Sequence, residues 1–219
     1  MVNYATINAR VDYGYSKSAL VLGPTYSQYR ASGANNPTAS GNLVSTVNVY
    51  LTVDAALKGA AQLQYGKNVW YGAIERNALS AGDYIIGPLG TFIAVALAFP
   101  GPVSFVQCNR TVAITRPLLG NGAGYAGTYS GDTTAAQSPI LSGWPASVLL
   151  TGSGVSGKPT GMKLPSDGKL PVVTITLPIT APDIEFNDVM TDDLGNRYYI
   201  SMAELTALGW RLTAEQVSQ

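Results

Sequence analysis

The chain has 219 residues, of which 12% are charged and 46% are apolar, and its formal net charge is zero. The apolar share excludes an intrinsically disordered chain, while the charged share is about half the usual one. A surface with so few charges is poorly protected against self-association. We therefore expect other subunits to cover much of it.

Histidine is absent and Cys108 is the only cysteine. This removes the commonest general base, the commonest metal ligand and any disulfide within the chain. Cys108 is interpreted as a small buried strand residue, with a reactive thiol as the alternative. No apolar run is long enough to span a membrane and the N-terminus lacks a signal-peptide layout, so we expect a soluble protein made in a reducing compartment, with no membrane contact and no cofactor.

Residues 1–23 are predicted to form an N-terminal helix, ended by Gly23 and Pro24. Its expected buried face follows spacings of three and four residues and comprises Ile7, Val11, Tyr15, Ala19 and Leu22. Tyr13 and Tyr15 are interpreted either as packing and helix cover or as anchors for a neighbouring subunit.

Residues 24–219 are predicted to form one β domain, a single β-sandwich or small barrel with long irregular loops. Short apolar or alternating segments separated by turn residues indicate its strands. The predicted strands are 25–30, 44–53, 69–74, 84–86, 92–99, 103–108, 111–115, 143–150 and 172–177.

Three polar excursions interrupt the predicted strands, at about residues 31–42, 118–139 and 151–170. The first and third have few apolar residues to offset the entropy of ordering, so both are expected to be mobile in an isolated subunit. The third contains three lysines, interpreted either as solvated loop residues or as contacts to phosphates or an acidic neighbour, namely Lys158, Lys163 and Lys169. The glycine-rich run 120–124 lacks the Lys-Ser/Thr follower of a phosphate-binding loop.

Residues 183–200 are predicted to form a strand, an acidic turn at 192–196 and a returning strand. Residues 82–94 have a similar pattern, in which an Asp opens an apolar strand and Leu-Gly follows six and seven positions later. Two related hairpins or chance reuse of common hairpin residues both explain the likeness. Beyond them, residues 204–212 suggest a short helical turn, with Trp210 docked on the sheet or contacting another subunit.

Five acidic residues gather around this hairpin: Asp183, Glu185, Asp188, Asp192 and Asp193. Paired carboxylates serve glycoside hydrolysis, and clustered ones bind calcium, although the spacing differs from an EF-hand loop. The interpretation favoured by their position is that they are turn and rim residues. No nucleophile, base and orienting group come together in the sequence, so no catalytic site is expected.

Residues 188–200 resemble the pattern D-[VI]-[ML]-x-D-D-x-G-x-R-Y-x-[VI], followed by Gly209-Trp210, of neck and tail-connector proteins in tailed bacteriophages. Residues 7–15, 70–72, 82–85, 90–93 and 108–112 are similar to the same group. The resemblance implies a non-enzymatic β-rich subunit, present in many copies in a ring between portal and tail.

On this resemblance the chain is expected in the virion, after assembly in the host bacterial cytoplasm. Its implied partners are copies of itself, portal or adaptor proteins, and tail proteins. Passive contact with the packaged DNA is also implied. A capsid-decorating or fibre-attachment protein is the alternative within that class, and a carbohydrate-active β protein is the alternative from another class. The candidate subunit contacts are Tyr13, Tyr15, Lys158, Lys163, Lys169 and Trp210.

Overall fold

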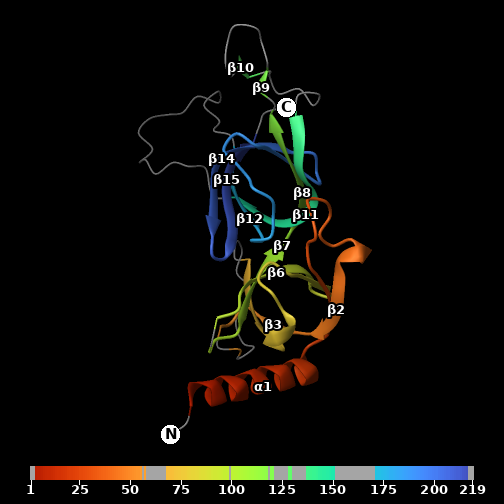
Figure 1. Ribbon diagram of the computed structural model, residues 1–219, viewed down its shortest axis with the longest axis vertical. Coiled ribbons are helices and arrows are strands. Elements are labelled where there is room, and N and C mark those ends of the chain that lie inside the picture. Colours follow the sequence, from red (N-terminus) through yellow and green to blue (C-terminus); the bar gives the residue numbers. More distant parts are fainter. Residues whose placement is uncertain are drawn as a thin grey trace, which may run out of the picture.

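The computed structural model describes residues 3–55, 57, 68–98, 100–117, 119–120, 128–129, 137–150 and 171–216. The fold is mainly β with one N-terminal helix, which confirms the predicted class. Figure 1 shows an elongated arrangement in which the helix lies across one end and two β units follow along the long axis. The strands are thus divided between two units where the sequence analysis expected one sandwich or barrel.

Helix α1 (Tyr4–Leu22) is capped by Asn3, whose side chain accepts a hydrogen bond from the Ala5 amide. It ends at Gly23, where an added Cβ would lie 2.5 Å from the Val49 carbonyl carbon, so only glycine allows this close approach.

The predicted buried face of α1 is only partly correct. Ala19 is buried, and Val11 and Tyr15 are half-buried. Ile7 and Leu22 are instead 46% and 61% exposed, which contradicts the prediction for these two residues. The reason is geometric, because the helix crosses one end of a β unit that covers only part of its length (Figure 1).

The first β unit, called the rolled sheet, spans residues 25–108. Its strand order is β2-β1-β5-β6-β7-β4-β3. Strands β2 and β3, at the two edges, are parts of one stretch separated only by the fully buried Val49, so the sheet curls back on itself. The strands are β1 (Thr25–Tyr29), β2 (Leu43–Asn48), β3 (Tyr50–Thr52), β4 (Val69–Ala73), β5 (Tyr84–Gly87), β6 (Gly90–Ala96) and β7 (Val103–Cys108).

The second β unit, called the barrel, spans residues 110–216 and closes in the order β11-β12-β15-β14-β13-β8. A separate pair, β9 (Leu119–Gly120) and β10 (Thr128–Tyr129), lies between β8 and β11 in the sequence. The barrel strands are β8 (Arg110–Pro117), β11 (Gln137–Leu150), β12 (Val172–Leu177), β13 (Val189–Asp192), β14 (Arg197–Thr206) and β15 (Gly209–Gln216). Two short 3-10 turns, η1 (Ser40–Asn42) and η2 (Arg76–Ala78), lie in the first unit.

The two units repeat one topology. In chain order, β1, the β2–β3 stretch, β4, β5, β6 and β7 correspond to β8, β11, β12, β13, β14 and β15. Each of the six antiparallel pairings in the rolled sheet has its counterpart in the barrel. The similar segments 82–94 and 187–200 are therefore equivalent hairpins of two repeats, which supports the interpretation of related hairpins over chance reuse.

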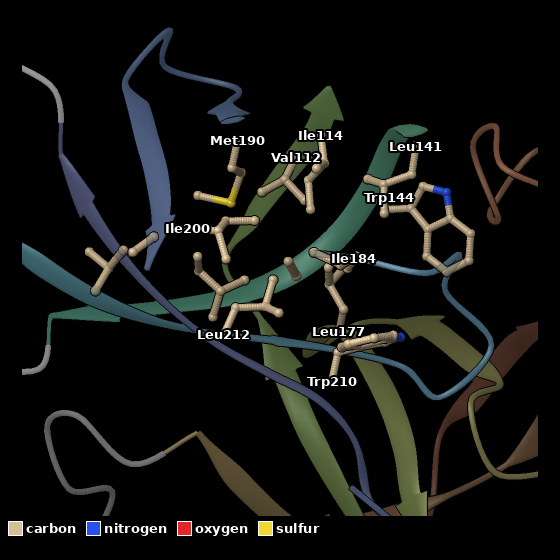
Figure 2. Close-up of a cluster of buried hydrophobic side chains, with 14 of the residues drawn as sticks. Val112, Ile114, Leu141, Trp144, Leu177, Ile184, Met190, Ile200, Trp210 and Leu212 are labelled. Carbon is tan, nitrogen blue, oxygen red and sulfur yellow. The ribbon is translucent and has the colours of Figure 1, made fainter. Parts of the chain in front are cut away.

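The core has two parts. One fills the interior of the rolled sheet around Phe92 and Phe105. The other fills the barrel, where Val112, Met190, Ile200 and the residues labelled beside them in Figure 2 converge. This second cluster also contains apolar residues from the outer face of β5, β6 and β7, so the barrel core extends into the contact between the two units.

A polar contact joins the units within this shared core. The buried Tyr84 hydroxyl of β5 donates a 2.8 Å hydrogen bond to the Pro145 carbonyl of β11. Its ring meets the Trp144 ring edge-on, with centroids 6.3 Å apart. The units are therefore held together both by apolar burial and by directional contacts.

The loop 31–42 is ordered against the barrel, contrary to the expectation of a free excursion. The Asn36 amide donates to the Ser142 carbonyl, and the Ser142 amide donates to the Ala34 carbonyl. The Trp144 indole N–H also donates to Ala34 at 2.7 Å, and Pro37 is buried. These backbone and side-chain bonds supply the ordering energy that the sparse apolar residues of the loop do not.

Two other boundaries differ from the predictions. Residues 137–139 belong to β11, so the second excursion ends earlier than expected. Residues 204–212 form the β14–β15 hairpin rather than a helical turn, because they pair with each other across the turn at 207–208. The third excursion, 151–170, lies outside the described residues.

Candidate functional site

The acidic hairpin is organised by an ion pair between Arg116 of β8 and Asp188. The Arg116 Nε and Nη2 atoms donate to the two carboxylate oxygens of Asp188 at 2.8 and 3.0 Å. The Glu185 amide donates to Asp188 Oδ2 at 2.7 Å, and Asp188 is only 1% exposed. The hydrogen bond to Asp188 raises the pKa of the Arg116 guanidinium above its ordinary value. A carboxylate held by three donors in this way fixes the entry to β13.

The rolled sheet contains the same arrangement at its equivalent hairpin. Arg30, which follows β1, donates through Nε and Nη2 to the two oxygens of Asp83 at 2.7 and 2.8 Å. The amide three residues before the aspartate, that of Ser80, donates to Asp83 Oδ2 at 2.8 Å. The fully buried Gln28 adds a bond from Nε2 at 2.7 Å.

Even the backbone before each aspartate is equivalent. Gly82 has φ +90° and Asn187 has φ +70°, and both lie directly before the paired aspartate. Glycine and asparagine are the residues that adopt this left-handed conformation most readily. The repeat is thus conserved within the chain down to a backbone dihedral and a bidentate ion pair.

Asp192 closes the turn of the second hairpin. Its Oδ1 accepts from the amides of Leu194 and Asn196 at 3.0 and 2.8 Å. Its Oδ2 accepts from the Asn196 side chain and from the Tyr198 hydroxyl, at 3.0 and 3.2 Å. Burial first, and the nearby Asp192 charge second, raise the pKa of Tyr198. Asp192 is therefore a turn residue, as the sequence interpretation favoured.

The remaining acidic residues of the group lie at the surface. Glu185 accepts from Arg116 Nη1 at 2.7 Å with its side chain 57% exposed. Asp193 lies 3.9 Å from Arg110 and is 45% exposed. No group of three or more histidine, cysteine or acidic residues in the described part of the chain has the geometry of a metal site. Asp188 and Asp192 have their oxygens occupied by internal donors, which is the bonding expected of structural carboxylates.

Cys108 lies at the end of β7 and packs against the shared core. Burial raises the pKa of its thiol, so the thiolate needed for nucleophilic chemistry is disfavoured near neutral pH. This agrees with the interpretation of Cys108 as a small buried strand residue.

The predicted subunit contacts differ in how far their side chains are exposed. Trp210 is only 6% exposed and belongs to the barrel core, so it is not an exposed contact. Tyr15 is half-buried, donates from its hydroxyl to the Pro100 carbonyl at 3.2 Å, and lies under the Arg76 guanidinium. Tyr13 is 66% exposed on the far face of α1 and is available to a partner. Lys158, Lys163 and Lys169 lie outside the described residues.

The strongest candidate surface consists of exposed apolar side chains from a segment with one charged residue, and the sequence analysis missed it. Between Lys17 and Asp54 the only charged residue is Arg30, and its guanidinium is paired with Asp83. Within this span large apolar side chains are half or more exposed, namely Leu20, Val21, Leu22 and Leu43, with Val44 at 49%. The signal was present in the sequence as a 36-residue stretch with one charge.

A second exposed apolar surface lies on the β14–β15 hairpin. Met202, Leu205 and Leu208 are each more than half exposed. Between this hairpin and the outer face of the rolled sheet is a hollow of about 390 Å³, lined mainly by apolar side chains such as Val69 and Val95. The hollow contains no arrangement of acid, base and nucleophile among its lining residues.

Comparison of the chain with protein-family models, with curated proteins and with solved structures found no match. Among the described residues, no helix is both long enough and apolar enough to cross a membrane.

Proposed function

We propose that this protein is a non-enzymatic structural subunit that assembles with copies of itself into a ring, in the neck or tail connector of a tailed-phage particle. The observation that carries the proposal is the set of exposed apolar side chains in the segment 18–53, whose one charged residue, Arg30, is paired with Asp83. Exposed apolar side chains next to an open sheet edge promote association, and soluble monomers normally protect such edges with charge or proline.

The polar groups of the chain support this proposal in another way. The buried carboxylates Asp83, Asp188 and Asp192 are bound by donors of their own fold, and this bonding gives them a structural use. A rigid double unit with internally paired charges suits a building block. Such a subunit presents constant surfaces to its neighbours.

The resemblance of residues 188–200 and 82–93 to neck and tail-connector proteins supports placing the ring between portal and tail. In that place its partners are its own copies, portal or adaptor proteins and tail proteins, with passive contact to packaged DNA. Assembly takes place in the host bacterial cytoplasm. The exposed Tyr13 of α1 is a contact we assign to a neighbouring subunit.

The test is the assembly state of the purified full chain, measured by analytical ultracentrifugation and negative-stain electron microscopy. We expect closed rings of uniform size. Leu20→Ser together with Tyr13→Ser is expected to weaken assembly without lowering the melting temperature, since both side chains are more than half exposed. Tyr13→Phe together with Leu20→Met, which keeps both exposed apolar side chains, is the matched control and should leave assembly intact.

A strictly monomeric protein at all concentrations would contradict the proposal. Hydrolysis of bacterial polysaccharide that is lost in Asp188→Asn or Asp192→Asn, with folding unchanged, would favour the carbohydrate-active alternative. Genes for portal, terminase and capsid proteins beside this one would support the phage particle, and their absence would count against it.

A further inference from the structure

Because the two units are repeats, the outer edges of two equivalent strands can be compared. These strands are β11 in the barrel and β2 in the rolled sheet. In the barrel, β11 pairs with β8 along residues 137–146 and with β12 only from Ser147 onward. The edge before Ser147 is covered by the loop 31–42, through the two backbone bonds between Ser142 and residues 34–36. The loop is therefore joined to β11 by an isolated parallel bridge between Asn35 and Ser142.

The equivalent edge in the rolled sheet is not covered by another strand. At Thr46–Asn48 it borders a hollow of about 180 Å³ that is also lined by Leu20 of α1 and by Glu75. Strand β2 pairs with β1 over residues 43–48, and the stretch pairs with β4 only from Tyr50 onward. On its other side β2 has no strand partner among the residues that the structure describes. When the two repeats are aligned, Tyr26 of β1 is equivalent to Val112 of β8. Their paired residues, Val47 of β2 and Trp144 of β11, are therefore equivalent as well.

Thr46 is consequently the counterpart of the bulge at Ser142 and Gly143. The Val49 amide donates to the Pro24 carbonyl, and hydrogen-bonded positions alternate along an antiparallel pair. Val47 and Ser45 thus direct their backbone groups to β1, and Thr46 directs its N–H and C=O to the open edge. In the barrel the corresponding Ser142 groups are both bonded to the loop.

A second open edge lies on the barrel. Strand β13 pairs with β14 only at residues 197–199, whereas β14 continues to Thr206. From Ser201 to Thr206 its side facing away from β15 has no strand partner within the described residues. The equivalent strand β6 ends at Ala96, so this extension is not needed to close a unit of this topology.

We propose that the outer edge of β2 in one subunit pairs with the outer edge of β14, residues 201–206, in a second copy. The two edges have the same length, since β2 has six residues. Both are nearly free of charge, with Glu204 as the one charged residue, and that side chain is already paired to Arg211 at 2.7 Å. Exposed apolar side chains flank both edges, Leu43 and Val44 on one and Met202 and Leu205 on the other.

The positions of the edges determine the kind of assembly. In Figure 1, β2 and β14 lie on opposite sides of the long axis. A contact between two different surfaces is head-to-tail, so it continues from copy to copy until a ring closes. This inference rests on the proposed function, because it specifies the contact by which the ring forms.

Disulfide trapping between separately purified variants tests the pairing. Val44→Cys and Thr46→Cys mark β2, while Met202→Cys and Glu204→Cys mark β14. Wild type, with Cys108 alone, is the control for background cross-linking. We expect disulfide-linked dimers only when a β2 variant is mixed with a β14 variant, because each variant carries one introduced thiol. Cross-linking of a β2 variant with itself would indicate a two-fold contact instead and would overturn the proposal.

Thr46→Pro is the second test, because it removes an N–H from the open edge without removing a bond to β1. We expect an unchanged melting temperature and loss of the oligomer at concentrations where wild type is assembled. Thr46→Val, which keeps the N–H, should assemble normally. Rings that form with no mixed cross-link at any of the four pairs contradict this inference and leave the proposed function standing. A wild type that never assembles contradicts both.

Discussion

The rolled sheet and the barrel have the same strand order and the same ion pair at the same hairpin, yet they differ in what covers their edges. Strand β11 is covered by residues 34–36 of the same chain, whereas β2 is open. The β14–β15 hairpin is extended, whereas β6 stops at Ala96. Features that both units share are those required to build the fold, and features that only one unit has are available for function.

The comparison predicts its largest effects at the paired aspartates. Asp83→Ala removes an acceptor shared by Arg30, the buried Gln28 and the Ser80 amide, which we expect to cost about 2–3 kcal/mol in the free energy of unfolding, because Arg30 is 44% exposed. Asp188→Ala should cost less, because Asp188 accepts from Arg116 and the Glu185 amide and has no additional buried donor like Gln28. Urea denaturation of both variants measures the difference. A larger loss for Asp188→Ala would show that the two pairs are not equivalent in energy.

Trp144→Phe tests how firmly the loop 31–42 binds the barrel. The change removes the indole donor to the Ala34 carbonyl and part of a fully buried ring. We expect a loss of about 2 kcal/mol together with faster amide exchange at Asn36. Hydrogen exchange followed by mass spectrometry measures the second effect. Unchanged exchange at Asn36 would mean that the backbone bonds to Ser142 hold the loop by themselves.

Tyr84→Phe removes the polar contact between the units and should cost about 1–2 kcal/mol at neutral pH, because the Pro145 carbonyl loses its donor. Burial raises the pKa of Tyr84 well above its ordinary 10.0. Above pH 10 the unfolded chain therefore loses the Tyr84 proton while the folded chain keeps it. The free energy of unfolding of the wild type then falls as pH rises, by up to about 1.4 kcal/mol per pH unit for each such group.

Tyr84→Phe should make this alkaline decline shallower, while Tyr26 and Tyr198, whose pKa values burial also raises, maintain the remainder. Urea denaturation between pH 8 and 11 measures the slope. An identical slope in the variant would contradict the role assigned to the Tyr84 hydroxyl.

The smallest expected change in stability concerns the two residues with left-handed backbone conformation, Gly82 and Asn187. Asn187→Gly should change stability by less than about 0.5 kcal/mol, because glycine adopts φ +70° readily. Gly82→Asn should cost about 1–2 kcal/mol, because a Cβ there would lie 2.8 Å from Thr180 Cγ2. Thermal denaturation of both variants checks the pair. Equal losses would mean that the conformation, and not the space around it, limits both sites.

Local chemistry in the sequence determined the elements. Gly23 and Pro24 end the helix, alternation of apolar residues marks most strands, and the turn residues 192–196 mark the second hairpin. The similarity between residues 82–94 and 183–200 was also visible, although the sequence left chance reuse of common hairpin residues open as its explanation. Each of these signals acts within a few residues of its own position, so it could be read without the fold.

The tertiary structure alone decided how those elements combine. Arg30 pairs with Asp83 and Arg116 pairs with Asp188 across 53 and 72 residues, and no local pattern specifies such partners. Trp210 is buried because β15 closes the barrel beside β12, not because of its neighbours in sequence. The loop 31–42 is ordered by a surface formed more than 100 residues later at Ser142. The outer edge of β2 is unpaired because no described strand lies against it. Strand pairing over long distances depends on the whole closed topology, which only the folded chain contains.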